Sequence, residues 1–328
     1  MASYIIRRLL YMIPVLLIIS VIAFLVIELP PGDYFTQMMD QMVSQYGADA
    51  EKTVEQYRAA YGLDKPIHVR YFRWVTNIVL HGDFGRSFQD NTSVREILIS
   101  RVPLTLLITT FSLLLAWIIA VPIGVYSAVK QYSMFDYGAT ILAFLGMAIP
   151  NFLLATILLA VFYNVFGLSV GGLYSPEYRQ AAWSFAKLLD LAKHLIIPVI
   201  VIGTADMAGL VRVIRAMMLD ELGKQYVQTA RAKGAPEWVV IWKHMLKIAM
   251  LPVISTIGWM LPRLISGAAV VSIVMNLPTV GTRLLKALLE QDSYVSAGLL
   301  LVLGTFTVIG TLISDIAMAG IDKRIDYD

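Results

Sequence analysis

The chain has no cysteine and little charge. Among its 328 residues there are 0 Cys, and only 15% are Asp, Glu, Lys or Arg. The missing thiols exclude a disulfide framework, a thiolate metal site and a Cys nucleophile. By contrast, 58% of the residues are hydrophobic and the mean hydropathy is +0.71, more apolar surface than a soluble core of this length could bury. We therefore predict an all-α polytopic membrane protein that is surrounded by lipid.

Common catalytic motifs are also missing. No G-x-x-x-x-G-K-[ST] loop is present, so we do not expect this chain to hydrolyse ATP by that route. H-E-x-x-H and G-x-S-x-G are absent too. The few histidines are scattered without paired ligand spacing: His68, His81, His194 and His244. We expect no enzyme activity and no metal or cofactor bound by this chain.

Long apolar runs supply the spanning helices. One span needs about 20 predominantly apolar residues, and six such runs occur, at about 8–28, 101–130, 136–166, 194–211, 248–274 and 293–314. Arg7 and Arg8 precede the first run, as in a signal peptide, but this run exceeds the roughly 7 to 15 residues of a signal-peptide core. We interpret it as a retained helix.

Basic residues set the predicted orientation. Segment 212–247 holds seven basic residues against three acidic ones, so it is predicted to be cytoplasmic. Six spans then place both termini in the cytoplasm and the chain in the cytoplasmic (inner) membrane. The net charge of +3 reflects topology, and no stripe of basic residues suggests a nucleic-acid partner.

Three parts follow from these spans: a first transmembrane helix at 1–30, an extracytoplasmic domain at 31–100, and a five-helix core at 101–328 that includes the cytoplasmic loop 212–247. In the second part, 54–63 and 68–80 have helical patterns separated by a turn at 64–66. We expect a small helical domain outside the membrane.

The segment 226–252 places a charged, glycine-broken helical element between two apolar runs. Gly234 suits the end of one helix and Pro236 the first turn of another that begins around Glu237. A projecting helix-turn-helix is suited to docking on another protein, while the plainer interpretation is a solvated loop whose charge only fixes topology. Trp238 and Trp242 fit either contact with a partner or packing beneath the membrane.

Two charged residues, Asp206 and Arg263, fall inside predicted spans, where an ionisable group costs roughly 2.5 to 3.5 kcal/mol. They are candidates to face a pathway or to pair with each other. Alternatively, Asp206 lies near the cytoplasmic edge or pairs with Arg212, and Arg263 contacts another subunit.

Many landmarks occur together in the order of one family. The segment with Tyr226, Thr229-Ala230-Arg231-Ala232-Lys233-Gly234, His244, Leu246 and Pro252 closely resembles the cytoplasmic signature loop of ABC importer permeases of the dipeptide and oligopeptide type. Further landmarks cover nearly the whole chain: Pro31-Gly32-Asp33, 82–88, 149–152, His194 with Pro198, Arg212 with Arg215, Pro278 with Gly281, Asp315 and 322–325.

The resemblance implies a permease subunit that forms half of a translocation pathway. Expected partners are a second permease, usually a different chain, two ATPase subunits that carry ATP and Mg, and an extracytoplasmic solute-binding protein. It also implies a coupling helix that contacts the ATPase, with these candidate residues: Thr229, Ala230, Arg231, Ala232, Lys233, Gly234, Ala235, Pro236 and Glu237.

Departures from the family pattern keep the solute open. Thr279 and Val280 stand where Gly-Leu is frequent, Ser272 where Glu is frequent, and Ile248 where Asn is common. This variant resembles a branch that includes oligosaccharide importers, so peptides, oligosaccharides and metal complexes all fit. A self-contained secondary transporter is the rival class, but no internal hydropathy repeat is evident.

Overall fold

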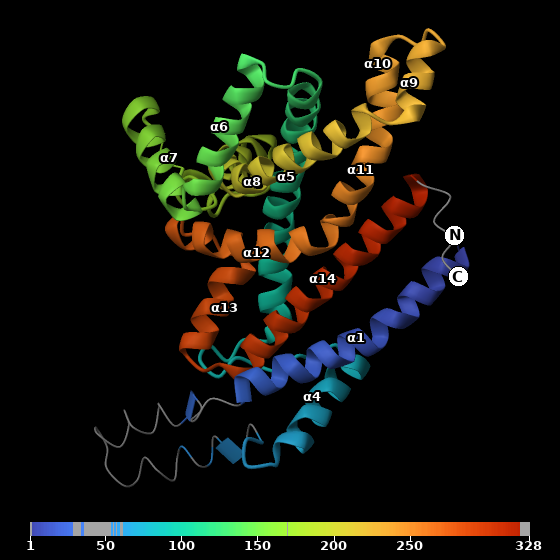
Figure 1. The fold of residues 1–328 in the computed structure, drawn as a ribbon. Helices are drawn as coiled ribbons and strands as arrows, with labels where there is room; N and C mark the ends of the chain where they lie inside the picture. The colour runs from blue at the N-terminus through green and yellow to red at the C-terminus, as the bar shows by residue number, and fades with distance from the viewer. Residues whose placement is uncertain are drawn as a thin grey trace. The chain divides into compact units, whose positions relative to one another are not determined.

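The computed structural model describes residues 2–28, 34–35, 54, 56, 58–59, 62–168 and 170–321. The landmarks at 31–33 and 322–325 lie outside these residues, and the predicted helix at 54–63 lies partly outside them. Regular elements in the described ranges are helical (Figure 1). The longer ones are α1 (Ala2–Glu28), α4 (Ile67–His81), α5 (Val94–Val129), α6 (Met134–Ala148), α7 (Asn151–Phe166), α8 (Phe185–Leu222), α12 (Ile257–Val274), α13 (Val280–Leu289) and α14 (Ser293–Ile321). Shorter elements are the 3₁₀ turn Pro176–Tyr178, α9 (Gln225–Ala232), α10 (Glu237–Val239), the π-helical turn Val240–Met245 and α11 (Leu246–Ser255).

Within the described residues, five helical segments are long and apolar enough to cross a membrane: Ile5–Glu28, Val94–Val129, Phe185–Leu222, Glu237–Ser255 and Ser293–Gly320. A sixth crossing is possible if α6 and α7, which are bent by 101° to each other, form one broken span. The all-α polytopic prediction is confirmed. The turn at 64–66 and the helix predicted at 68–80 are also present, the latter as α4.

Two predicted spans are interrupted. The third apolar run breaks at Ile149 and Pro150, because proline disfavours helical geometry in the residue before it. The fifth run, expected as one helix over 248–274, is divided at Thr256 into α11 and α12, which take different directions in Figure 1. Pro252 cannot donate to the helix ladder, and the Thr256 hydroxyl donates to the Val253 carbonyl at 2.6 Å, so the backbone is locally weakened there.

The chain divides into two compact units. The first comprises 1–6, 104–278 and 309–328, and the second comprises 7–103 and 279–308. In the first unit, α8 is the central element: it packs against α6, α7, α11 and α12. One apolar cluster joins α5 and α8 to the segment 227–253, and another joins α5, α7, α8 and α12.

In the second unit, the start of α5 packs with α13 and α14, and α1 packs with α4 and α14. A buried polar cluster ties segment 87–90 to the helix pair α13 and α14. Arg283 donates to the Asp90 carboxylate at 2.9 Å, and the Ser87 hydroxyl donates to Asp292 at 2.5 Å. Burial raises the pKa of Asp292, against the effects of Ser87 and Arg283. Thr279, one of the unusual residues noted above, caps α13 with its side chain.

Candidate functional site

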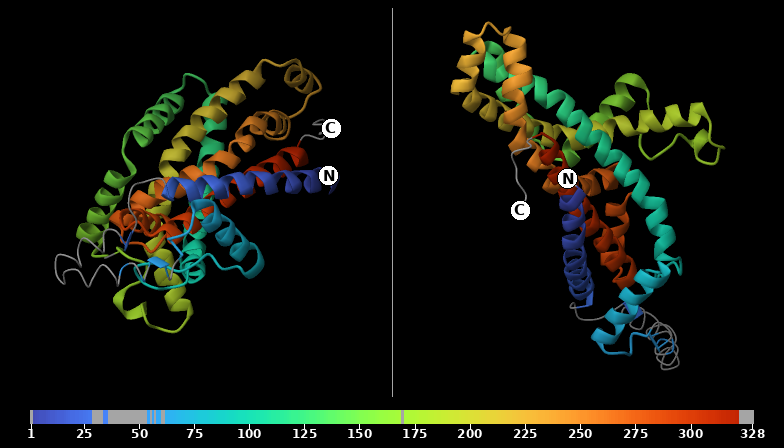
Figure 2. Two further views of the ribbon diagram at one scale, coloured as in Figure 1. Left: turned by 90° about the horizontal axis from the view of Figure 1, so that it is seen from below. Right: turned by 90° about the vertical axis from the view of Figure 1, so that its right-hand side faces the viewer.

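A helical hairpin leaves the end of α8 and returns through α11. Its first arm is α9 and its second begins at α10, which agrees with the predicted end near Gly234 and start at Glu237. Gly234 has φ +76°, and the Ala235 N–H donates to the Ala230 carbonyl at 3.2 Å, a bond typical of a glycine-ended helix. Figure 2 shows the hairpin, drawn in yellow and orange, at one end of the first unit.

Gly234 is needed for its backbone conformation and not for space. A Cβ atom built at this position would meet no atom within 4 Å. A left-handed conformation of this kind costs most other residues roughly 1 to 2 kcal/mol. The turn between the two arms therefore depends on this single glycine.

An ion pair spans the turn. Arg231 donates to both carboxylate oxygens of Glu237, from Nη2 at 2.5 Å and from Nε at 3.2 Å. The pKa of Arg231 is raised, chiefly by this hydrogen bond. Both side chains are about half exposed, at 40% and 52%, so the pair fixes geometry more than it adds stability.

Buried residues fasten the hairpin to the membrane core. Val227 in α9, and Val240 and Met245 in the second arm, are fully buried in the cluster that contains α5 and α8 residues. Ala230 and Ala235 also pack against this cluster. The hairpin thus packs directly on α5 and α8.

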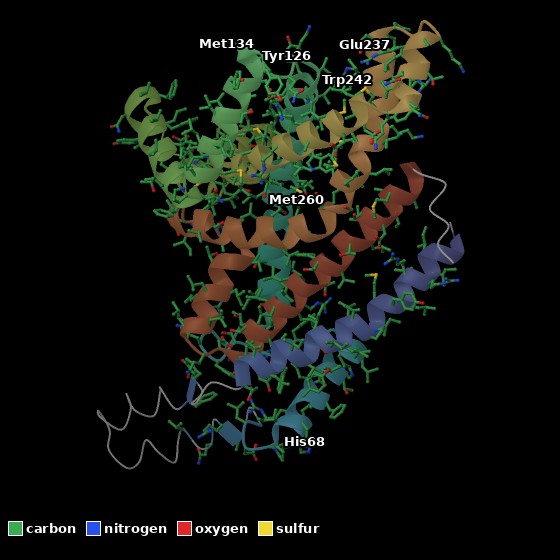
Figure 3. The ribbon with its side chains drawn as sticks, viewed as in Figure 1. His68, Tyr126, Met134, Glu237, Trp242 and Met260 are labelled. Atoms are coloured by element: carbon green, nitrogen blue, oxygen red, sulfur yellow. The ribbon has the colours of Figure 1, made fainter. Side chains whose placement is uncertain are left out.

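The opposite side of the hairpin is exposed. It presents five of the candidate coupling residues besides the Arg231–Glu237 pair: Thr229, Ala232, Lys233, Gly234 and Pro236. Trp238 and Trp242 are exposed by 68% and 48%. In Figure 3, Glu237 and Trp242 lie at the same end of the first unit as Tyr126 and Met134. This end combines apolar and charged side chains that nothing in the described chain covers.

The start of the hairpin is held by Tyr226, whose hydroxyl donates to Glu221 at the end of α8. Burial and the neighbouring carboxylate raise the pKa of Tyr226. The second arm then passes through a π-helical turn over Val240–Met245, which the sequence did not predict. Such turns are frequent at functional sites, but they have no reliable sequence signal.

A partly buried ion pair in the same unit was also missed. Asp136 in the first turn of α6 accepts from Arg215 of α8 through two bonds of 2.7 Å, and Ser127 of α5 donates to the same carboxylate. Asp136 is 2% exposed. The sequence offered one signal for the position of Asp136 in a first helical turn: Ser133, three residues earlier, is a typical helix cap, and it does cap α6. This cluster joins the three helices α5, α6 and α8.

The two candidate pathway residues lie on helices that pack together. Asp206 is buried in α8, and Arg263 belongs to α12, which contacts α8. Asp206 has polar or ionic partners, and the side chain of Arg263 lies outside the described residues. Their mutual pairing stays a prediction.

Helices of spanning length, with an exposed hairpin packed on two of them, define a polytopic membrane protein. Comparison with known families gives the particular class. Residues 120–327 match the model for the binding-protein-dependent transport system inner membrane component, and residues 1–109 match the model for the N-terminal part of such components. The chain belongs to this family.

Two relatives match this chain along the whole length of both proteins. The chain is 41% identical over 331 residues to the oligopeptide transport system permease protein AppB of Bacillus subtilis, covering 100% of both chains. It is 32% identical over 342 residues to the dipeptide transport system permease protein DppB of Alkalihalophilus pseudofirmus, again covering 100% of both. The resemblance to ABC importer permeases is thus confirmed, and the chain is a multi-pass transport component of the inner membrane.

Proposed function

We propose that this chain is one permease subunit of an ATP-driven peptide importer and that its hairpin couples it to the ATPase. The subunit forms half of the translocation pathway, beside a second permease that is a different chain. ATP and Mg are bound by two separate ATPase subunits, and a solute-binding protein delivers the peptide from outside. The observation that carries this proposal is a projecting hairpin, exposed on one side and rooted in α5 and α8 on the other.

The mechanism follows from this two-sided construction. A groove on the ATPase accepts the exposed side of the hairpin, as a helix is accepted in many protein grooves. When nucleotide closes the ATPase pair, the groove shifts the hairpin as a rigid body. Val227, Val240 and Met245 then carry the movement to the membrane helices, because fully buried residues cannot slide without opening voids.

The proposed orientation has both termini in the cytoplasm. Its support is the excess of Lys and Arg in 212–247 and the position of the α5–α6 connection, which carries Lys130, at the same end as the hairpin (Figure 3). The segment between α1 and α5 is then extracytoplasmic.

Peptides are the preferred solute because the full-length relatives are named for oligopeptide and dipeptide transport. An oligosaccharide is the competing solute. Uptake into cells that lack the chromosomal copy separates the two: restored uptake of labelled short peptides supports the proposal, and restored uptake of oligosaccharides alone replaces it.

Asp206 and Arg263 are proposed as a pair that faces the pathway. Single charge reversals at either position should abolish uptake, and exchanging the two charges should restore it. Failure of the exchange, with both variants still inserted in the membrane, would reject the pair.

Co-purification tests the assembly. The tagged chain, extracted in mild detergent and analysed by mass spectrometry, should recover a second permease and ATPase subunits that contain the phosphate-binding loop which this chain lacks. Recovery of this chain alone from several mild detergents would favour the self-contained transporter.

A further inference from the structure

The helix α4 has two apolar faces, of which this chain covers only one. On the inner face, Trp74 is 3% exposed and packs against Phe24 of α1 with ring centroids 5.5 Å apart. On the outer face, Phe72, Val79 and Leu80 are 66%, 73% and 69% exposed. A helix that is apolar on both faces needs a second apolar environment.

The polar residues of α4 are arranged along its axis. His68, Arg70 and Arg73 lie in its first half, the residues from Trp74 to Leu80 carry no charge although Thr76 and Asn77 are polar, and His81 ends the helix. The helix contains no acidic residue. A basic first half followed by a largely apolar stretch suits a helix whose first turns meet anionic phosphate and whose next turns meet hydrocarbon.

The contacts with α1 show which part of α4 lies near the end of the α1 span. Arg70 pairs with Glu28, at the end of the α1 span, through a contact of 2.6 Å. Trp74 lies beside Phe24, and the helices run side by side in opposite directions (Figure 1). The basic half of α4 therefore lies near the end of α1, and its apolar half lies beside the middle of that span. Figure 3 places His68 at the far end of α4 from this apolar half.

An apolar groove continues from this half of α4. It has a volume of about 740 Å³ and is lined by residues of α1, α4, α5 and α14, with Val79, Leu17 and Val302 among them. Three of the four helices are long and apolar enough to span a membrane. Apolar walls beside three such helices are suited to hold hydrocarbon.

We propose that α4 enters one leaflet of the bilayer beside α1 and that its outer face and the adjoining groove hold the acyl chains of a phospholipid, with Arg73 and His68 beside its phosphate. The leaflet, which is the outer one, follows from the orientation proposed above. The lipid contact itself does not depend on that orientation or on the identity of the transported solute.

The absence of native cysteine makes a direct test possible. Single cysteines are introduced by Phe72→Cys, Val79→Cys and His68→Cys, labelled with a fluorophore, and studied in the complete complex in phosphatidylethanolamine and phosphatidylglycerol vesicles. Quenching is compared between lipids that carry a nitroxide deep in the acyl chain and a water-soluble quencher. The unsubstituted complex gives the background from partner subunits. Ile22→Cys on the exposed face of α1 is the lipid reference, and Glu177→Cys in an exposed connection is the water reference.

The proposal predicts that the labels at 72 and 79 are quenched by the lipid nitroxide as strongly as the label at 22, and that the label at 68 is quenched more by the water-soluble agent. Adding Arg73→Glu should reduce the lipid quenching of the label at 79. Quenching of 72 and 79 at the level of the label at 177 would overturn the proposal. Protection of both from either quencher would also overturn it, because a protein partner would then cover the groove. Peptide uptake by each labelled complex is scored separately, so loss of uptake does not bear on the lipid contact.

Discussion

At the scale of single residues, Gly234 decides the shape of the hairpin. Gly234→Val must place a branched side chain in the left-handed region, while Gly234→Asn tolerates it better. We expect Gly234→Val to lower the affinity for the ATPase by roughly tenfold, since about 1.4 kcal/mol corresponds to that factor, and Gly234→Asn to change it little. Titration of the purified permease pair with ATPase subunits measures this.

The matched control is Gly223→Ala, because Gly223 is also exposed and open but has φ −86°. Equal losses in Gly234→Asn and Gly234→Val would mean that the hairpin does not depend on the glycine backbone.

The Arg231–Glu237 pair gives a second test at this scale. Each charge reversal alone should weaken ATPase binding, because it places like charges at the two positions that now pair across the turn. If the pair only fixes the turn, the exchanged double variant should recover binding. Binding that stays lost in the double variant would show that Arg231 contacts the ATPase itself. The measurement is the same titration.

At the scale of helices, Asp136 and Arg215 hold α5, α6 and α8 together. Arg215→Gln should destabilise the complex by about 3 to 5 kcal/mol, because it leaves the buried Asp136 carboxylate unpaired. Asp136→Asn should cost less, because the Arg215 side chain is 25% exposed. The double variant should cost no more than the worse single one, since both charges are then gone. Thermal unfolding in detergent measures these costs, and Arg212→Gln, an exposed position on α8, is the control. Strictly additive losses would argue against a coupled pair.

Close contact between α5 and α8 predicts that added side-chain volume at this contact destabilises the protein. A Cβ atom on Gly124 would lie 2.9 Å from Ile214, and one on Gly203 would lie 3.0 Å from the Ser112 carbonyl. Gly124→Ala should therefore destabilise the protein by about 1 to 3 kcal/mol through overpacking. Gly209→Ala, on the same α8 but with no atom within 4 Å, should be neutral. The two variants can be compared by melting temperature, and equal effects would contradict this account of the α5–α8 contact.

At the scale of the whole molecule, the sequence was sufficient for the class of fold and for the hairpin. Long apolar runs are a strong signal, and the Gly-Ala-Pro-Glu order at 234–237 specifies a turn locally. It was insufficient for the divisions at Ile149 and Thr256, because an uncharged run does not reveal where its axis changes direction. The Asp136–Arg215 pair joins residues 79 positions apart, which local patterns do not report.

The same limit applies to the candidate site. Motif order pointed to the coupling residues, but only the three-dimensional arrangement separates the inward Ala230 and Ala235 from the exposed Ala232 and Lys233. The outer face of α4 was likewise hidden in the sequence, since its apolar residues looked like those of any packed helix.

The most direct measurement is photo-crosslinking from the hairpin inside cells. A photoreactive benzoylphenylalanine replaces Lys233, or, as a control, Arg179 in an exposed connection of the same unit. We predict that the group at 233 forms a covalent adduct with the ATPase subunit and that the group at 179 forms none. Adducts at 233 with lipid or with other permease chains only, in cells that contain the ATPase, would contradict the proposal that this hairpin couples the permease to ATP hydrolysis.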